Sequence, residues 1–378
     1  MQRARLLATL SSELAFDRDP RNAEVPSDEA LAIARASGDP GLLVTVLGLR
    51  LIGLWRPDRV SVRLDHAAEL EAICRMAGDA RRGKFLSAMT MCCQAVMEAG
   101  DLVSADRLLA WIEETAGTLK QPTSLGYAKL RLASRACIAG RFEEAEQLAD
   151  EAYFYCAKSG QPDAAAFHTG QIFTIRLHQG RTDEVIDRMA LAFRDHPGIE
   201  TFAAGEAFCA ADLGDAARCR RALVPVLAAL GDLRFDLNWL ATLGLASRAV
   251  HFLGDRDAAA RIKRTIEPYR NLYIDNASAF FGSALHSFAV LSSMEVSDSD
   301  DIVRSFDRAR AAHDSLKSPP WQARTLVEYA RYMRTSGHPD RARDLAESAL
   351  DLGRDYALAW VAAEAASLLA ALADTSTR

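Results

Sequence analysis

The chain has 378 residues, of which 49% are hydrophobic and 25% charged, and its formal net charge is -6 at pH 7. This acidic balance argues against broad nucleic-acid binding, which needs a basic face. No segment approaches the uninterrupted apolar length that spans a bilayer, and the amino terminus lacks the apolar core and cleavage pattern of a secretory signal. We therefore expect no direct contact with nucleic acid or membrane.

The cysteines indicate a reducing compartment. There are seven of them, an odd number, and they form no Cys-x-x-Cys pair. They fall on predicted helices, where cysteine usually acts as a small apolar residue. We therefore expect free thiols and a cytoplasmic location.

The predicted elements are helices throughout, because alanine dominates the apolar residues and β-branched runs of period two are missing. In chain order they are Met1–Phe16, a helix capped by Ser27 and ending at Ser37, Leu42–Leu54 and Val60–Met76. Helical hairpins then follow at about 82–117, 124–160, 163–196, 200–230, 237–269, 280–316 and 321–354, and a last helix at 357–373. Residues 232–236 and 270–278 interrupt the rhythm and are expected to be projecting loops.

Short glycine turns of nearly the same sequence punctuate these hairpins. Their glycines are Gly100, Gly140, Gly180, Gly214, Gly254 and Gly337, at intervals of 40, 40, 34, 40 and 83 residues. Each glycine supplies the positive backbone dihedral that ends the first helix of a hairpin. Intervals of this size are typical of tandem helical repeats, and the last one spans two of them.

Small and apolar residues recur in register with the turns. Five residues after each glycine stand Ala105, Ala145, Val185, Cys219, Ala259 and Ala342, and twelve residues after it stand Ile112, Ala152, Ala192, Val226, Ile266 and Ala349. Positions seven apart are two helical turns apart, so both columns lie on one face of the second helix. That face is where the two helices of a hairpin must approach closely.

The sequence therefore predicts an all-α protein, a solenoid like those of tetratricopeptide repeats, with about eight to nine helical hairpins in a right-handed superhelix. Because each repeat contacts only its neighbours, one domain over residues 1–378 is expected. We divide it into N-terminal repeats (1–120), central repeats (121–278) and C-terminal repeats with a capping helix (279–378). Such a coil is expected to leave a curved, concave trough.

Two resemblances support this prediction. The segment 140–148 (GRFEEAEQL) resembles the second half of a tetratricopeptide repeat. A wider set of short motifs is similar to the carboxyl-terminal helical region of large actinobacterial regulators: residues 27–35, 63–65, 69–70, 121–122, 171–181, 238–240, 268–269, 282–283 and 320–321.

In that family an ATPase of the signal-transduction type precedes the repeats, joined to a nucleotide cyclase or a LuxR-type DNA-binding domain. The chain has no phosphate loop of the Gly-x-x-x-x-Gly-Lys-Ser/Thr type, and no helix-turn-helix follows Ala373. The resemblance therefore implies only the sensing or docking part of such a regulator, and it supplies no catalytic residue.

Candidate binding residues lie on the first helices of the hairpins, the layer that lines the inner curve of a tetratricopeptide array. Arginine and aromatic side chains are favoured there, because they supply bidentate contacts and rigid apolar area. The candidates are Arg50, Lys84, Tyr127, Arg131, Arg135, His168, Gln171, Trp239, Trp321 and Arg324. The two tryptophans serve equally well as packing anchors.

One pair among these candidates points to an anionic contact. Arg131 and Arg135 are four residues apart and would repel each other on one face unless an acidic ligand or partner lies between them. A glutamate from the neighbouring repeat would satisfy the pair equally well.

The leading hypothesis is a non-enzymatic scaffold or sensor that binds a protein, a peptide or a small effector in the trough, in bacterial signalling or transcriptional regulation. The sequence leaves open whether the chain forms a homodimer. The alternative is an enzyme, such as a lyase, cyclase or hydrolase, with Asp236, His251, His286 and Glu328 as acid and base on adjacent repeats. No metal-ligand or dinucleotide signature is present, so we expect no metal and no cofactor.

Overall fold

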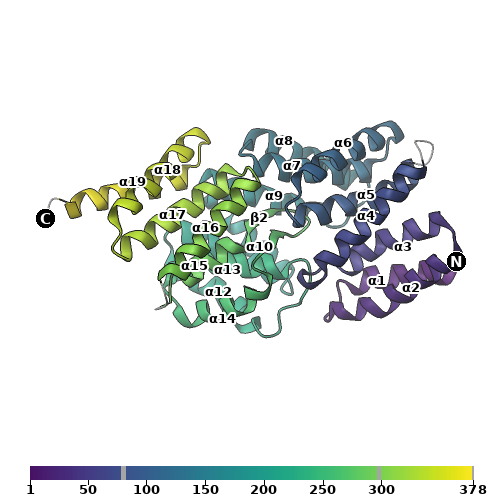
Figure 1. Cartoon of the computed structure of the whole chain (residues 1–378), viewed down its shortest axis with the longest axis horizontal. Coiled ribbons are helices and arrows are strands. Elements are labelled where there is room, and N and C mark those ends of the chain that lie inside the picture. The colour runs from purple at the N-terminus through teal and green to yellow at the C-terminus, as the bar shows by residue number, and fades with distance from the viewer. Residues whose placement is uncertain (78–81, 296–298, 377–378) are drawn as a thin grey trace.

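The structure, a computed structural model, describes residues 1–77, 82–295 and 299–376. In these residues nineteen α-helices form nine successive hairpins and a final helix. Figure 1 shows the hairpins stacked along the long axis, with α1 to α3 towards one end and α18 and α19 at the other. The all-α helical solenoid predicted from the sequence is confirmed. The single domain and its three subdivisions stay predictions.

The helices are named by their order in the chain. The first ten are α1 (Gln2–Leu14), α2 (Glu24–Ser37), α3 (Pro40–Gly53), α4 (Val60–Ala77), α5 (Arg82–Glu98), α6 (Leu102–Leu119), α7 (Pro122–Ile138), α8 (Phe142–Lys158), α9 (Ala164–Gln179) and α10 (Ile186–Asp195). The others are α11 (Glu200–Asp212), α12 (Ala216–Ala229), α13 (Trp239–Leu253), α14 (Arg256–Ile266), α15 (Ala284–Ser292), α16 (Ser299–Ser315), α17 (Pro319–Thr335), α18 (Pro339–Asp355) and α19 (Ala359–Ser376). Short 3-10 turns lie at Pro20–Ala23, Pro57–Arg59, Thr182–Glu184 and Glu267–Tyr269.

The turn glycines predicted from the sequence repeat are confirmed by their backbone dihedrals. All six predicted turn glycines have a positive φ, between +68° and +84°. An aspartate follows three of these glycines, and its side chain accepts a hydrogen bond from the backbone N–H three residues on, which fixes where the next helix begins. These caps are Asp101 to Ser104, Asp215 to Arg218 and Asp255 to Ala258. Both predicted columns are buried except at Ala192, which is half-buried.

Two predicted boundaries are wrong. Ser27 does not cap α2, which begins at Glu24; its hydroxyl is buried one turn inside the helix and accepts a hydrogen bond from Arg50. Phe280 does not begin a helix, because residues 280–283 pair with an upstream strand, and α15 starts at Ala284.

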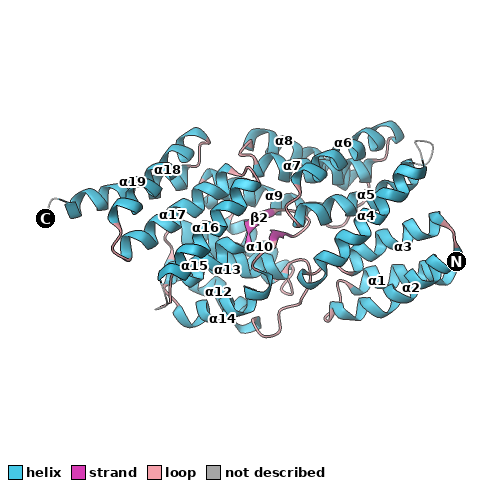
Figure 2. Cartoon of the chain, in the orientation of Figure 1, coloured by secondary structure: helices cyan, strands magenta, loops and turns pink. Residues whose placement is uncertain are grey.

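That pairing forms a small β-hairpin between α14 and α15, where a projecting loop was expected. Strand β1 (Tyr273–Asp275) pairs antiparallel with β2 (Phe280–Ser283), and a bulge lies between the paired positions. Figure 2 shows the two strands in the middle of the molecule, surrounded by helices. They contact α5, α13, α15 and α16. The hairpin is part of the protein core, because the side chains of Ile274, Phe280 and Phe281 are buried.

The C-terminal helices also fold back onto earlier ones. Helix α17 contacts α7, and α19 contacts α9. A Cβ placed on Gly180, at the end of α9, would lie only 2.6 Å from the backbone nitrogen of Trp360, so the two segments meet where only glycine fits. Arg324 on α17 donates to the carbonyl of Leu177 on α9. In this region the expected trough is therefore filled by the chain itself.

In the described part of the chain, no helix is both long and apolar enough to cross a membrane.

Candidate functional site

Two of the arginines predicted to line the trough are paired inside the protein. Arg50 donates to the Ser27 hydroxyl (2.8 Å) and to Nε2 of His66 (2.9 Å). Arg131 is buried, and its Nη1 lies 3.6 Å from Oδ1 of Asp275 on the β-hairpin. Each side chain thus joins two parts of the fold, which is a structural contact.

Arg135, one turn after Arg131, points to a different carboxylate. Its Nε and Nη2 contact the two oxygens of Asp106 on α6, at 2.6 and 2.9 Å. The two arginines therefore do not share one anion, because each has an acidic partner of its own. For Arg135 the partner comes from the neighbouring repeat, as in the alternative that the sequence left open, although it is an aspartate and not a glutamate.

Three further candidates lie at the surface or half-buried. The hydroxyl of Tyr127 accepts a hydrogen bond from Gln161 at 2.6 Å. Nε2 of His168 lies 2.8 Å from Oδ1 of Asp150. Lys84 is exposed in the first turn of α5. The structure does not bring these three together with the remaining candidates into one site.

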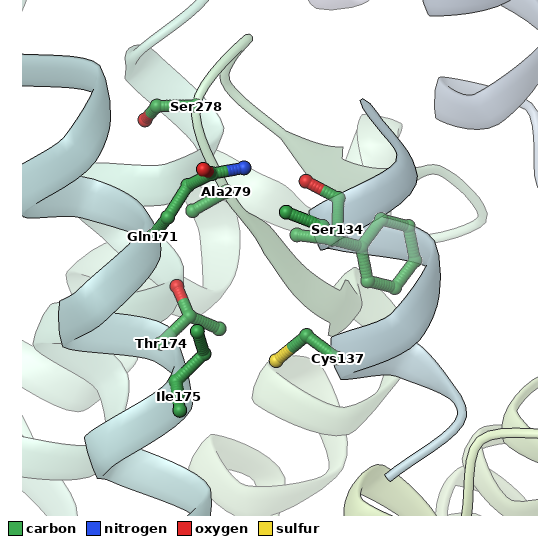
Figure 3. Close-up of a pocket in the computed structure, with 9 residues that line it drawn as sticks. Ser134, Cys137, Gln171, Thr174, Ile175, Ser278 and Ala279 are labelled. Atoms are coloured by element: carbon green, nitrogen blue, oxygen red, sulfur yellow. The ribbon is translucent and has the colours of Figure 1, made fainter. Parts of the chain in front are cut away.

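Gln171 lies beside a small cavity between α7, α9 and the β-hairpin. Its amide nitrogen donates to the carbonyl of Leu130 at 2.6 Å, and Oε1 has no partner among the described residues. Figure 3 shows Gln171 and Thr174 on one side of this cavity and Ser134 and Cys137 on the other. The cavity holds about 10 Å³, which is room for one water at most. A second space of the same size lies beside Asp236.

Both candidate tryptophans are packing anchors. Trp239 makes edge contacts with Phe235 and Tyr269, with ring centroids 4.9 and 5.4 Å apart. Trp321 lies among three buried or half-buried histidines: His178, His286 and His313. Both tryptophans thus make the packing contacts that the sequence analysis gave as the alternative to ligand binding.

The structure gathers only part of the acid and base set that was considered for an enzyme. Nδ1 of His251 on α13 lies 3.7 Å from Oε2 of Glu328 on α17, and this oxygen has no hydrogen-bond partner in the described chain. His286 lies on the adjacent helix α15, within electrostatic range of both residues. Asp236 lies elsewhere, in the loop before α13, where it pairs with Arg234 at 2.9 Å.

The hydrogen bonds around His286 fix the positions of its protons. The N–H of Ser283 donates to Nε2 of His313, so His313 carries its proton on Nδ1 and donates to Thr325 Oγ1. Thr325 donates its only proton to the carbonyl of Trp321, so it must accept from Nδ1 of His286 as well. His286 therefore presents an unprotonated Nε2. Its burial lowers its pKa to about 4.

Glu328 belongs to a buried ionic group that we call the Trp360 cluster. It consists of Asp212, Arg248, Arg324, Glu328, Arg331 and Trp360, contributed by α11, α13, α17 and α19. The three guanidinium carbons lie 4.3 to 5.6 Å from the Trp360 ring centroid. Asp212 pairs with Arg324 at 2.8 Å and with Arg248 at 3.1 Å.

The cluster keeps its acid ionised and its neighbouring histidine neutral. Burial alone would raise the pKa of Glu328, but the charges of Arg331 and Arg248 outweigh it and hold the pKa well below its usual range. Burial lowers the pKa of His251, and Glu328 offsets only part of that shift. These groups satisfy one another's charges, as expected for a structural network.

A cavity of ligand size lies elsewhere, between the second and third hairpins. Its volume is about 370 Å³, within the range of small-molecule sites. We call it the α4–α6 pocket. Its lining residues are Glu71, Cys74 and Arg75 on α4, Arg82 and Met89 on α5, and Arg107, Leu108 and Trp111 on α6.

The helical spacing of its residues explains how the pocket forms. Positions 71, 74 and 75 share one face of α4, and positions 107, 108 and 111 share one face of α6. Met89, Leu108 and Trp111 supply apolar and aromatic surface, while the long arginine side chains carry charge to the rim. The pocket thus combines an apolar interior with a charged edge.

The rim of the pocket carries more positive than negative charge. Glu71 pairs with Arg107 at 2.8 Å and lies 3.9 Å from Arg75. Arg82 contacts Glu114 at 3.2 Å, and its guanidinium carbon lies 5.7 Å from the Trp111 ring centroid. Glu71 is the only acid among the eight lining residues, against three arginines, and Glu114 outside the lining offsets the charge of Arg82.

Sequence reasoning missed all eight lining residues. The only sequence signal was the shared helical face on α4 and on α6. The signal is weak, because Arg107 and Trp111 lie on the second helix of a hairpin, outside the inner layer in which binding residues are expected.

In the described residues, no group of three or more histidine, cysteine, aspartate or glutamate side chains could hold a metal ion.

Comparisons with known proteins add little to this geometry. No protein-family model matches the chain, and no curated protein does. Among solved structures, one that matches is described as a circular tandem repeat protein with novel repeat topology and enhanced subunit contact surfaces. It is 12% identical, and the match covers 98% of this chain and 94% of that one, with a TM-score of 0.17. At that score the likeness carries no argument, and the class of helical-repeat protein rests on the hairpins described above.

Proposed function

We propose that the chain is a non-enzymatic helical-repeat sensor that binds a small organic anion in the α4–α6 pocket. The observation that carries this proposal is the pocket itself, a ligand-sized cavity with an apolar interior and a rim of three arginines. The ligand that fits has an apolar body of a few carbon atoms or one aromatic ring, and a carboxylate or phosphate head. The head would meet the arginines through charge-assisted hydrogen bonds.

The position of the pocket supports a role in signalling. It lies between α4 of one hairpin and α5 and α6 of the next, which are in contact. A ligand held there favours one arrangement of the two hairpins over others, and a solenoid sums such small changes along its length. We propose that this change is transmitted to a protein partner, in a bacterial regulator of the tetratricopeptide-like class that the sequence resembles.

The pKa values of the buried acid and base candidates support a sensor over the enzyme alternative. Glu328 is held ionised by Arg331 and Arg248, and His251 and His286 both have lowered pKa values. An acid–base pair needs one group that gives up a proton near neutral pH and another that accepts it. These three residues offer bases but no acid of that kind.

The proposal is tested by titrating the chain with defined anions and following tryptophan fluorescence. Hexanoate, benzoate and cyclohexanecarboxylate are compared with their neutral alcohols or amides. We expect the anions to bind at least about tenfold more tightly, the size of one lost charge-assisted hydrogen bond. Trp111→Phe should remove most of the signal change without abolishing binding.

Variants locate the site. Arg107→Gln should weaken binding about tenfold, because it removes a guanidinium at the rim. Arg221→Gln, at an exposed position on α12, is the matched control and should leave binding unchanged. Equal loss in both variants, or anions that bind no better than the alcohols, would refute a site in this pocket.

A further inference from the structure

The outer face of α1 carries a stripe of exposed residues that includes two leucines. Leu6 is 66% exposed and Leu10 48%. Arg3 and Glu13 lie on the same stripe, since residues three or four apart stack along one face of a helix, and both are exposed. The opposite face holds Ala4, Ala8, Ser11 and Ala15, which are all buried against the rest of the protein.

Among the described residues, this face lies at the N-terminal end of the stack. The main contacts of α1 in the described chain are with α2, α3 and the short turn at Pro20–Ala23. Figure 1 shows α1 and α2 at the N-terminal end of the stack. Six later first helices, namely α3, α5, α7, α11, α13 and α15, contact both the preceding and the following hairpin. The stripe on α1 has no hairpin against it among the described residues. Exposed leucines at such a position indicate a contact surface.

The order of residues along the stripe is self-complementary. When two copies of α1 are laid antiparallel about a two-fold axis midway between Leu6 and Leu10, residue i meets residue 16 minus i of the partner. Arg3 then faces Glu13 of the partner subunit, and Leu6 faces Leu10 of the partner subunit. The two-fold axis repeats both pairs, so each copy supplies one positive end, one negative end and an apolar centre. A two-fold interface requires this property, because the same patch must fit itself.

The existing partner of Arg3 does not oppose this pairing. Arg3 forms an ion pair with Glu29 on α2, and its side chain is 73% exposed. Such an exposed pair contributes little to stability, because water screens both charges. A guanidinium has donors enough for two carboxylates, so Arg3 can contact Glu29 and the partner's Glu13 together.

We propose that the stripe Arg3, Leu6, Leu10 and Glu13 is the contact surface of a homodimer, in which α1 of one copy packs antiparallel on α1 of the other. The interface is small, so the dimer is expected to dissociate on dilution. It is independent of the α4–α6 pocket and stands or falls without the proposed ligand.

Charge reversal in the full chain tests the pairing, with the mass measured by sedimentation over a range of concentrations. Arg3→Glu and Glu13→Arg should each weaken the dimer at least about tenfold, because each places two like charges at both ends of the interface. The double variant restores opposite charges and should dimerise as the natural chain does. A mixture of the two single variants should form a heterodimer for the same reason.

Two controls keep the test decisive. Arg5→Glu reverses an exposed charge on α1 away from the stripe, and it should leave the dimer intact. A circular dichroism melt of each variant separates loss of the dimer from loss of the fold. A natural chain that stays monomeric at every concentration would overturn the proposal. So would a dimer that ignores both single reversals, or a double variant that does not recover.

Discussion

The α4–α6 pocket and the Trp360 cluster are built from the same residue types with opposite outcomes. Each combines a tryptophan, three arginines and at least one carboxylate. In the pocket, the side chain of Arg107 is 56% exposed; in the cluster, that of Arg324 is 4% exposed. The difference arises because α17 and α19 fold back onto earlier helices in the second region, which turns a potential binding surface into a buried contact.

The largest expected difference in stability is between variants that each lose one arginine, one in the Trp360 cluster and one in the α4–α6 pocket. Arg324→Leu removes one of the two donors to the carbonyl of Leu177 and leaves Asp212 with one cation fewer, both in a buried setting. We expect it to lower the free energy of unfolding by about 3 kcal/mol. Arg107→Leu removes an exposed partner of Glu71 and should change the same quantity by less than about 1 kcal/mol. Urea unfolding followed by circular dichroism measures both.

Equal losses in the two variants would break the comparison, because they would mean that the rim arginine is as structural as the buried one. A small loss for Arg324→Leu would show that the fold-back of α17 contributes little to stability.

A smaller effect is expected from closing the space where the chain folds back. Gly180 and Gly254 both have a positive φ, of +74° and +68°. A Cβ at Gly180 would meet the backbone of Trp360, whereas one at Gly254 would meet nothing within 4 Å. Gly254→Ala should therefore cost about 1 kcal/mol for the dihedral alone. Gly180→Ala should cost about 1 kcal/mol more, because α9 and α19 must separate.

Thermal unfolding of the two alanine variants side by side measures the difference. If Gly180→Ala is no worse than Gly254→Ala, then the contact between α9 and α19 yields freely, and the interior is less tightly closed than the structure indicates.

The repeat could be predicted from the sequence because it is encoded locally. A glycine that ends one helix, an aspartate that caps the next and small residues seven apart act within a single hairpin. The path of the superhelix is not encoded in this way. The meeting of Gly180 with Trp360 depends on the sum of small rotations over many repeats, and no short motif reports it.

The candidate site was missed for the same reason. Arginine and tryptophan on first helices were good predictors of the inner layer, but Arg131, Arg324 and Trp321 are occupied by the fold-back and by the β-hairpin. The strands themselves carried a weak signal, the aromatic run at 280–281 after a loop with Asn276, which the helical rhythm overrode. The pocket at Trp111 needed the relative placement of three helices, which sequence spacing gives only one helix at a time.

The smallest expected effect concerns proton binding beside the Trp360 cluster. His178 on α9 is buried between Phe142 and Trp321, and its Nδ1 has no partner in the described chain. Burial, aided by the charge of Arg324, holds its pKa well below the ordinary histidine value of 6.5. As the pH falls below 6.5, the unfolded chain therefore takes up a proton that the folded chain refuses. Stability is full above that pH and is lost as the medium becomes more acidic.

His178→Met should remove one such group while filling the same space. Its free energy of unfolding should depend less steeply on pH between 6 and 5, by up to about 1.4 kcal/mol per pH unit. His338→Met makes the same substitution at an exposed position and is the matched control for the replacement itself. Urea unfolding at a series of pH values measures the slopes. An unchanged slope in His178→Met would show that this histidine is protonated in the folded chain, and that the region around Trp321 admits water as the α4–α6 pocket does.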